Sequence, residues 1–133
     1  MIPLRNRLDR LEDALHAAEI AWWEIEFPSG TVFFSEKKTQ MLGYDSSKDF
    51  FHYTHFTDLV HPDDLPAAMQ SMMDLMTGKS EVYETTYRIL AKDGSYKTFY
   101  DKGSIVSRLG DEFTVGGIVM LVENKQKIAI AHA

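Results

Sequence analysis

The chain of 133 residues contains no cysteine. This absence excludes disulfide scaffolds, thiol catalysis, cysteine-ligated zinc or iron–sulfur centres and thioether-anchored cofactors. Long apolar stretches are missing too, because the longest is Ile118–Val122, far short of the roughly 20 residues that span a bilayer. Met1–Ile20 is amphipathic and charged, unlike a secretory signal peptide. We therefore expect a cytoplasmic protein without a membrane span.

Basic residues are in short supply. Fourteen lysines and arginines face 20 aspartates and glutamates, which gives a net charge of −6 and a pI of about 5.3. Nucleic-acid binding needs a basic surface to neutralise phosphates, so this balance argues against a nucleic-acid partner. Apolar residues make up 44% and charged residues 26%, which is typical of one soluble globular domain.

The N-terminal segment, Pro3–Glu19, predicts a helix with an apolar stripe. The members of the stripe are spaced by four and three residues and form a short a/d seam. The seam covers only about two heptads, so it is consistent with a helix packed on its own domain or with a helical dimer contact. The candidate dimer residues are Leu4, Leu8, Leu11, Leu15 and Ala18.

The next segments predict a strand hairpin followed by short helices. Trp22–Phe27 and Thr31–Phe34 are separated by a turn sequence and read as two strands. Ser35 is placed to cap a short helix that runs to Leu42, and Gly43 is typical of the residue that ends a helix. We expect further short helical turns beyond this point.

A longer helix is predicted after His61-Pro62-Asp63-Asp64 and before Gly78. Proline suits a first helical turn, and the two aspartates would place negative charge at the positive end of the helix dipole. The apolar positions that follow repeat with helical spacing.

The last third predicts three antiparallel strands, Val82–Leu90, Ser95–Val106 and Phe113–Val122. Asp93-Gly94 is a strong hairpin signal, and Gly116-Gly117 indicates a bulge or a close approach of two backbones. Two short strands are not stable alone, so the first two strands must join the last three. The fold class is therefore α+β with an antiparallel sheet.

In its order of motifs the sequence resembles the PAS domain family, in the sensory-box form found in bacterial and archaeal sensor proteins. The likeness covers about residues 17–124, and it is the joint order and spacing of short motifs that is specific. The matching residues are Trp23-Glu24, Phe34-Ser35, Leu42-Gly43-Tyr44, His61-Pro62-Asp63-Asp64, Tyr87-Arg88, Asp93-Gly94-Ser95-Tyr96 and Gly117-Ile118.

The resemblance implies a PAS fold: a five-stranded antiparallel sheet flanked by short helices and one longer helix, preceded by the amphipathic helix. It divides the chain into a dimerisation helix (1–19), a sensory domain (20–124) and an exit segment (125–133). Two positions depart from the family. Thr98 stands where a tryptophan is frequent, and Leu121-Val122-Glu123 stands where Asp-Ile-Thr often couples the sheet to an output helix.

The function implied by the resemblance is a sensory module of a multidomain signalling protein, of the sensor histidine kinase or diguanylate cyclase type. Such modules dimerise through the N-terminal helix and control an output domain in the same or a partner chain. They are not enzymes, and the sequence shows no catalytic motif. The alternative is a ligand-free dimerisation or scaffold domain.

Methionines on the predicted long helix suggest a ligand cavity. Methionine is flexible and polarisable, so it can line an adaptable apolar pocket, but it also fills ordinary cores, and both readings stay open. The candidate pocket residues are Trp23, Ile25, Phe33, Met41, Phe56, Met69, Met72, Met73, Met76, Tyr87, Ile89, Ile118 and Met120.

The sequence does not identify a cofactor. A covalent flavin or a thioester chromophore is excluded because both need cysteine. Haem is not expected, because haem-binding members use a histidine on or near the long helix and Pro62–Thr77 contains none.

Three histidines raise the question of a metal site. Five residues in this region have side chains of the types that bind metal ions: His52, His55, His61, Asp63 and Asp64. Helix capping accounts for His61 and the aspartates, so we expect no metal.

Two charged residues of the first C-terminal strand have no obvious partner. Glu84 and Arg88 lie about 13 Å apart along the strand, too far to pair with each other. We expect them to pair across the sheet with Lys97 or Asp101, or to be solvated.

Overall fold

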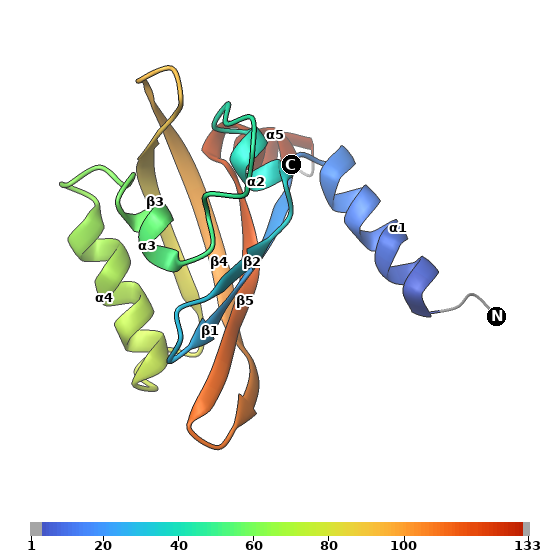
Figure 1. Cartoon of the computed structure of the whole chain (residues 1–133). Helices are drawn as coiled ribbons and strands as arrows, with labels where there is room; N and C mark the ends of the chain where they lie inside the picture. Colours follow the sequence, from blue (N-terminus) through green and yellow to red (C-terminus); the bar gives the residue numbers. More distant parts are fainter. Residues whose placement is uncertain (1–3, 132–133) are drawn as a thin grey trace.

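A computed structural model describes residues 4–131 of the chain. Its centre is one five-stranded antiparallel sheet with the order β2-β1-β5-β4-β3 (Figure 1). The expected five-stranded sheet and the joining of the two ends of the chain are therefore confirmed. The strands are β1 (Ala21–Phe27), β2 (Val32–Phe34), β3 (Tyr83–Leu90), β4 (Tyr96–Leu109) and β5 (Glu112–Leu121).

Helices cover one face of the sheet, and the terminal helices α1 and α5 meet it at the same end. Figure 1 shows α3 and α4 over one face, whereas α1 points away from the sheet. The helices are α1 (Leu4–Ala17), α2 (Lys37–Gln40), α3 (Tyr53–Thr57), α4 (Leu65–Met76) and α5 (Val122–Ala131). The exit segment expected at 125–133 is helical as far as Ala131, and its helix α5 already begins at Val122, which was expected to end a strand.

The core lies between the sheet and the helices on its covered face. On β3 the alternate residues Tyr83, Tyr87 and Ile89 are buried, as the two-residue period of a strand requires. Phe99 on the neighbouring strand β4 and Val119 on β5 are fully buried. The apolar alternation of the sequence therefore identified the inward face of β3 correctly.

Two glycines allow Trp23 to lie flat on the sheet. Gly103 on β4 and Gly117 on β5 are directly paired. A Cβ atom on Gly117 would lie 2.1 Å from the carbonyl oxygen of Lys102 and 2.8 Å from the Trp23 ring. The predicted close backbone approach is confirmed, and it makes room for an indole at the floor of the covered face.

The predicted cap at Ser35 is wrong. The Ser35 hydroxyl accepts a hydrogen bond from the backbone N–H of Trp22 at 3.2 Å, and α2 has no side-chain cap. Ser35 therefore joins the end of β2 to the start of β1. Gly43, with a φ of +83°, does end the helical segment as expected.

Candidate functional site

A cavity of about 220 Å³ lies between the sheet, α3 and α4. Its walls are mostly apolar and come from four strands (β1, β2, β3 and β4) and three helices (α2, α3 and α4). The lining residues are Trp23, Ile25, Phe27, Val32, Lys38, Tyr53, Phe56, Thr57, Val60, Leu65, Ala68, Met69, Met72, Met73, Met76, Tyr83, Tyr87 and Asp101.

Most of the candidate pocket residues meet at this cavity. All four methionines of α4 line the cavity, but only Met72 and Met76 are half-buried, whereas Met69 and Met73 are 48% and 52% exposed. The candidates that line the cavity are Trp23, Ile25, Phe56, Met69, Met72, Met73, Met76 and Tyr87.

Five candidates do not line the cavity, and three of them lie on the wrong side of a strand. Phe33 is exposed and its neighbour Val32 faces inward. Ile118 and Met120 flank the inward-facing Val119, so they belong to the opposite face of the sheet. Each of these three residues was expected on the inward face of its strand, but the residue that faces inward is its immediate neighbour in the sequence.

The other two candidates are core residues. Ile89 is fully buried on β3, where it pairs with Val60, and Met41 packs against the core at the end of α2. Neither reaches the cavity wall.

The sequence reasoning missed two charged residues of the site, Lys38 and Asp101. Lys38 is only 7% exposed and Asp101 only 4%. Lys38 comes from α2 and Asp101 from the middle of β4, and both line the cavity. A signal was present in the sequence. Lys38 precedes the core residue Leu42 by four, which is the same face of a helix, and Asp101 alternates with Phe99 on a strand.

Asp101 is held by aromatic side chains. The Tyr87 hydroxyl donates a hydrogen bond to its Oδ2 at 2.5 Å, whereas its Oδ1 is buried without a hydrogen-bond partner in the described chain. Burial raises the pKa of Asp101, and Lys38, Tyr87 and the nearby indole of Trp23 oppose that rise. The carboxyl group therefore gains a proton more easily than an exposed aspartate does.

The Lys38 ammonium group lies among aromatic rings, with the Trp23 and Phe34 ring centroids each 6.0 Å from its Nζ. Its Nζ lies 3.8 Å from the centroid of the Phe56 ring, a favourable cation–π contact. Burial lowers its pKa to about 8, although the charge of Asp101 acts in the opposite direction. Within residues 4–131, Lys38 makes no ion pair and its Nζ makes no hydrogen bond.

Two tyrosines complete the polar part of the wall. Burial raises the pKa values of Tyr83 and Tyr87 well above the usual value, and the negative charge of Asp101 raises them further. Both stay protonated, so Tyr87 acts as a hydrogen-bond donor. Tyr83 meets the Trp23 ring edge to face at 5.8 Å.

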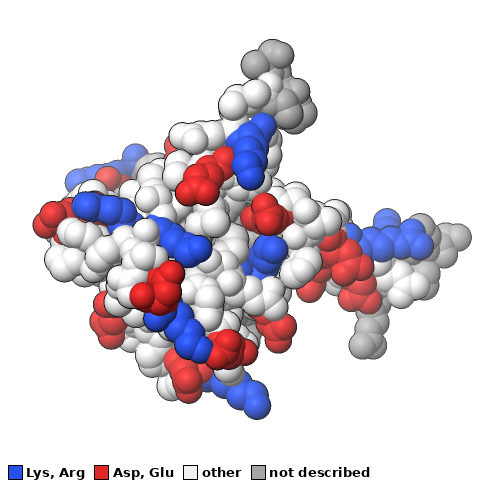
Figure 2. Space-filling view, turned by 90° about the horizontal axis from the view of Figure 1, so that it is seen from above, with Lys and Arg blue, Asp and Glu red and all other residues white. Residues whose placement is uncertain are grey.

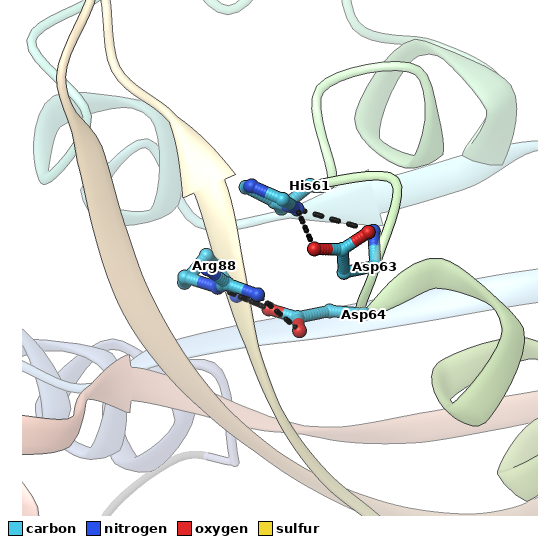
Figure 3. Close-up of polar contacts among 4 residues, drawn as sticks. All are labelled: His61, Asp63, Asp64 and Arg88. Atoms are coloured by element: carbon cyan, nitrogen blue, oxygen red, sulfur yellow. Dashed lines mark hydrogen bonds and ion pairs between the residues drawn. The ribbon is translucent and has the colours of Figure 1, made fainter.

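The His61-Pro62-Asp63-Asp64 segment forms a surface clamp (Figure 3). Asp64 accepts hydrogen bonds from the Nε and Nη2 of Arg88, each at 2.9 Å, and from the Arg88 backbone N–H at 2.8 Å. These bonds hold the pKa of Asp64 well below its usual range. Asp64 stands at the N-cap of α4, as expected, but its side chain makes no cap bond and instead fixes the start of α4 to β3.

The ring nitrogens of three histidines accept hydrogen bonds from nearby backbone N–H groups. The His61 Nδ1 accepts from the N–H of Asp63, while the Nδ1 atoms of His52 and His55 accept backbone N–H groups at the start of α3. The described part of the chain contains no group of three histidine or acidic residues able to hold a metal ion.

The outer face of the sheet connects to the terminal helices. The Asn124 side chain on α5 donates to the carbonyl oxygen of Ala18 at 2.9 Å, directly after α1. Lys125 lies 4.1 Å from the Tyr100 ring, and the Tyr100 hydroxyl donates to Glu84. The expected cross-strand partners of Glu84 and Arg88 were therefore wrong, since Asp101 points to the other face and Arg88 reaches Asp64.

The predicted stripe of α1 has no partner within the described residues. Leu8 is 52% exposed and Leu11 62%, Leu15 is half-buried and Ala18 is exposed. The side chain of Leu4 lies outside the described part of the structure.

Charges of both signs are interspersed on the face seen in Figure 2. No continuous basic patch is present on that face. Among the helices of residues 4–131, none combines the length and apolarity needed to cross a membrane.

Comparisons with known proteins agree with this architecture. A solved sensory box histidine kinase/response regulator from Burkholderia thailandensis is 18% identical, with a TM-score of 0.70 over 92% of this chain and 91% of that one. A putative light and redox sensing histidine kinase domain from Haloarcula marismortui is 19% identical, with a TM-score of 0.67 over 86% and 98% of the two chains.

A third structure, the N-terminal domain of a Marinobacter aquaeolei diguanylate cyclase with a PAS/PAC sensor, is 18% identical, with a TM-score of 0.65 over 80% and 98%. No curated protein matches the chain. The family model described as "PAS fold" matches residues 31–119, which is most of the chain. This chain therefore belongs to the PAS fold family, and its fold is similar to that of domains from histidine kinases and a diguanylate cyclase.

Proposed function

We propose that the chain is a signal-input module that binds a small molecule in the cavity between α4 and the sheet and relays its occupancy to an output domain. The observation that supports ligand binding is the cavity itself, about 220 Å³ between α4 and the sheet. It exceeds the engineered apolar cavity of about 150 Å³ that takes up benzene. A domain used only as a scaffold has no need of such a space in its core.

The relay follows from contacts on the sheet. Asp101 on the cavity wall and Tyr100 on the outer face are adjacent on β4, and Lys125 of α5 covers the Tyr100 ring. Asn124 joins α5 to the end of α1. A ligand that shifts β4 therefore alters the packing of both terminal helices, and each helix can pass the change to a neighbouring domain.

Methionine methyl NMR tests binding directly. The chain has seven methionines, four of which line the cavity, whereas Met41 and Met120 do not. Titration of ¹³C-methyl-labelled protein with benzamide, a neutral probe, should shift Met69, Met72, Met73 and Met76 and leave Met41 unchanged.

The same titration tests the relay. Backbone amide signals of Asn124 and Glu19 should move together with the cavity methyls. Absence of any methyl shift with benzamide or benzoate would favour the scaffold alternative. Methyl shifts without a response at Asn124 would contradict the relay.

We also propose that the chain forms a homodimer through α1. The stripe is exposed and repeats with coiled-coil spacing, so a second copy of the same helix would complement it. Leu8→Asp combined with Leu11→Asp should convert the mass measured by light scattering to that of a monomer. An unchanged mass would rule out this seam.

A further inference from the structure

The most unusual feature of the cavity is a cation without an acceptor. Lys38 is more than nine-tenths buried and lines the cavity, but within the described chain it forms no ion pair and no Nζ hydrogen bond, and the charge of Asp101 acts on it only from beyond ion-pair distance. The Phe56 ring stabilises the charge from one side but accepts no strong hydrogen bond. A buried ammonium group needs both a counter-charge and acceptors.

We infer that the cavity accepts a small monocarboxylate with an aromatic or other apolar body, whose carboxylate pairs with the Lys38 ammonium group. This inference rests on the proposed function, because it names the class of ligand that the same cavity takes.

The charge of the ligand follows from the polar part of the wall. Lys38 is the only lysine or arginine among the residues that line the cavity, so one negative charge is matched and a second is not. Asp101 also lines the cavity and would repel a dianion such as a phosphate monoester. Asp101 does not take the place of the ligand, because it forms no ion pair with Lys38 and its Oδ2 is already bound to Tyr87.

The apolar body follows from the remaining wall. The methionines of α4 face Trp23 and Phe56 across the cavity, and such walls accommodate flat or branched apolar groups. The volume of about 220 Å³ leaves space for a benzene ring with one carboxylate-sized substituent. Benzoate is therefore a suitable probe, and benzamide is its neutral counterpart of the same shape.

The experiment compares benzoate and benzamide at pH 7 by methyl NMR titration of the whole chain. We expect benzoate to bind the wild-type protein at least about tenfold more tightly than benzamide, because only benzoate supplies a counter-charge. Lys38→Met should abolish this preference, and Lys38→Arg should retain part of it. Lys37→Met, on the same helix but away from the cavity, should leave it unchanged.

A pH series gives an independent readout. The affinity for benzoate should fall by about tenfold per pH unit above pH 8, as Lys38 loses its proton, whereas the affinity for benzamide should stay level. The other titratable groups on the wall are Asp101, Tyr53, Tyr83 and Tyr87. The Lys38→Met variant measures how much these groups contribute to the pH dependence. Its affinity for benzoate should stay constant over the same pH range.

The outcomes separate the two proposals. Equal affinities for benzoate and benzamide in the wild type, or a benzoate preference that survives Lys38→Met, overturn the carboxylate inference and leave the cavity as a ligand site. If neither probe moves the α4 methionine methyls, the ligand-binding function fails as well.

Discussion

Two acid–base pairs link the helical layer to the sheet, but only one of them is in contact. Asp64 and Arg88 form a three-bond clamp near the surface. Lys38 and Asp101 are both buried, yet they form no ion pair. The clamp is complete within the chain, whereas in the buried pair Asp101 Oδ1 has no hydrogen-bond partner and Lys38 forms no ion pair within the described residues.

The pKa values of the four residues show the same contrast. Binding to Arg88 depresses the pKa of Asp64, and binding to Asp64 raises that of Arg88, so each stabilises the charged form of the other. In the buried pair, burial lowers the pKa of Lys38 and raises that of Asp101, so both charged forms are disfavoured. A surface ion pair of this kind stabilises the fold. A buried pair in which both charged forms are disfavoured destabilises the fold, and such pairs are expected at functional sites.

The largest expected effect is a rise in stability with pH in the alkaline range. The pKa of Lys38 is about 8 in the folded chain and 10.5 when unperturbed, so the unfolded chain binds more protons between these values. The free energy of unfolding should therefore increase from pH 8 to 10.5, by up to about 3 kcal/mol. Urea denaturation across this range measures it. The relevant quantity is the difference from Lys38→Met, which cancels the contributions of all other groups, and a constant difference contradicts the prediction.

The next effect is stabilisation by Lys38→Met at pH 7. The substitution removes a buried charge and keeps an unbranched side chain among aromatic rings, so we expect a gain of about 2–3 kcal/mol in the free energy of unfolding. The adjacent Lys37 is only half-buried, and Lys37→Met should change stability by less than about 0.5 kcal/mol. Loss of stability in Lys38→Met would show that the attraction to Asp101 outweighs the cost of burial.

The sequence predicted the sheet better than it predicted the site. The alternation of apolar residues identified the inward face of β3. The adjacent glycines of β5 predicted the close approach of two backbones beneath Trp23. Phe33 was misassigned because β2 is short, and three consecutive apolar residues carry no alternation that could set its phase.

The charged part of the site was missed for a different reason. Lysine and aspartate side chains are rarely fully buried, so residue type alone predicts that Lys38 and Asp101 are exposed to solvent. Only the neighbouring residues on each element reveal them as inward-facing. The partner of Asp64 could not be inferred either, because the distance to Arg88 depends on how α4 docks on β3, which no local pattern encodes.

A smaller effect is expected from the hydrogen bond that holds Asp101. Tyr87→Phe removes the donor to Oδ2 and should lower the free energy of unfolding by about 1–2 kcal/mol at pH 7. Tyr83→Phe is the matched control, because Tyr83 is buried on the same wall but donates no hydrogen bond to Asp101. Equal losses in the two variants would mean that packing, not the hydrogen bond, sets the effect.

The smallest effect is expected at the clamp, because solvent screens its partly exposed charges. Asp64→Asn keeps the shape but replaces one acceptor oxygen by a donor, so the melting temperature at pH 7 should fall by less than in Tyr87→Phe. The folded pKa of Asp64 is depressed, so its contribution is present above its ordinary value and is lost as the pH falls below it. The difference in melting temperature between wild type and Asp64→Asn should therefore shrink in acid. Asp63→Asn, at an exposed neighbour, should show little change at either pH, and an equal loss there would mean that general charge, not the bonds to Arg88, stabilises this corner.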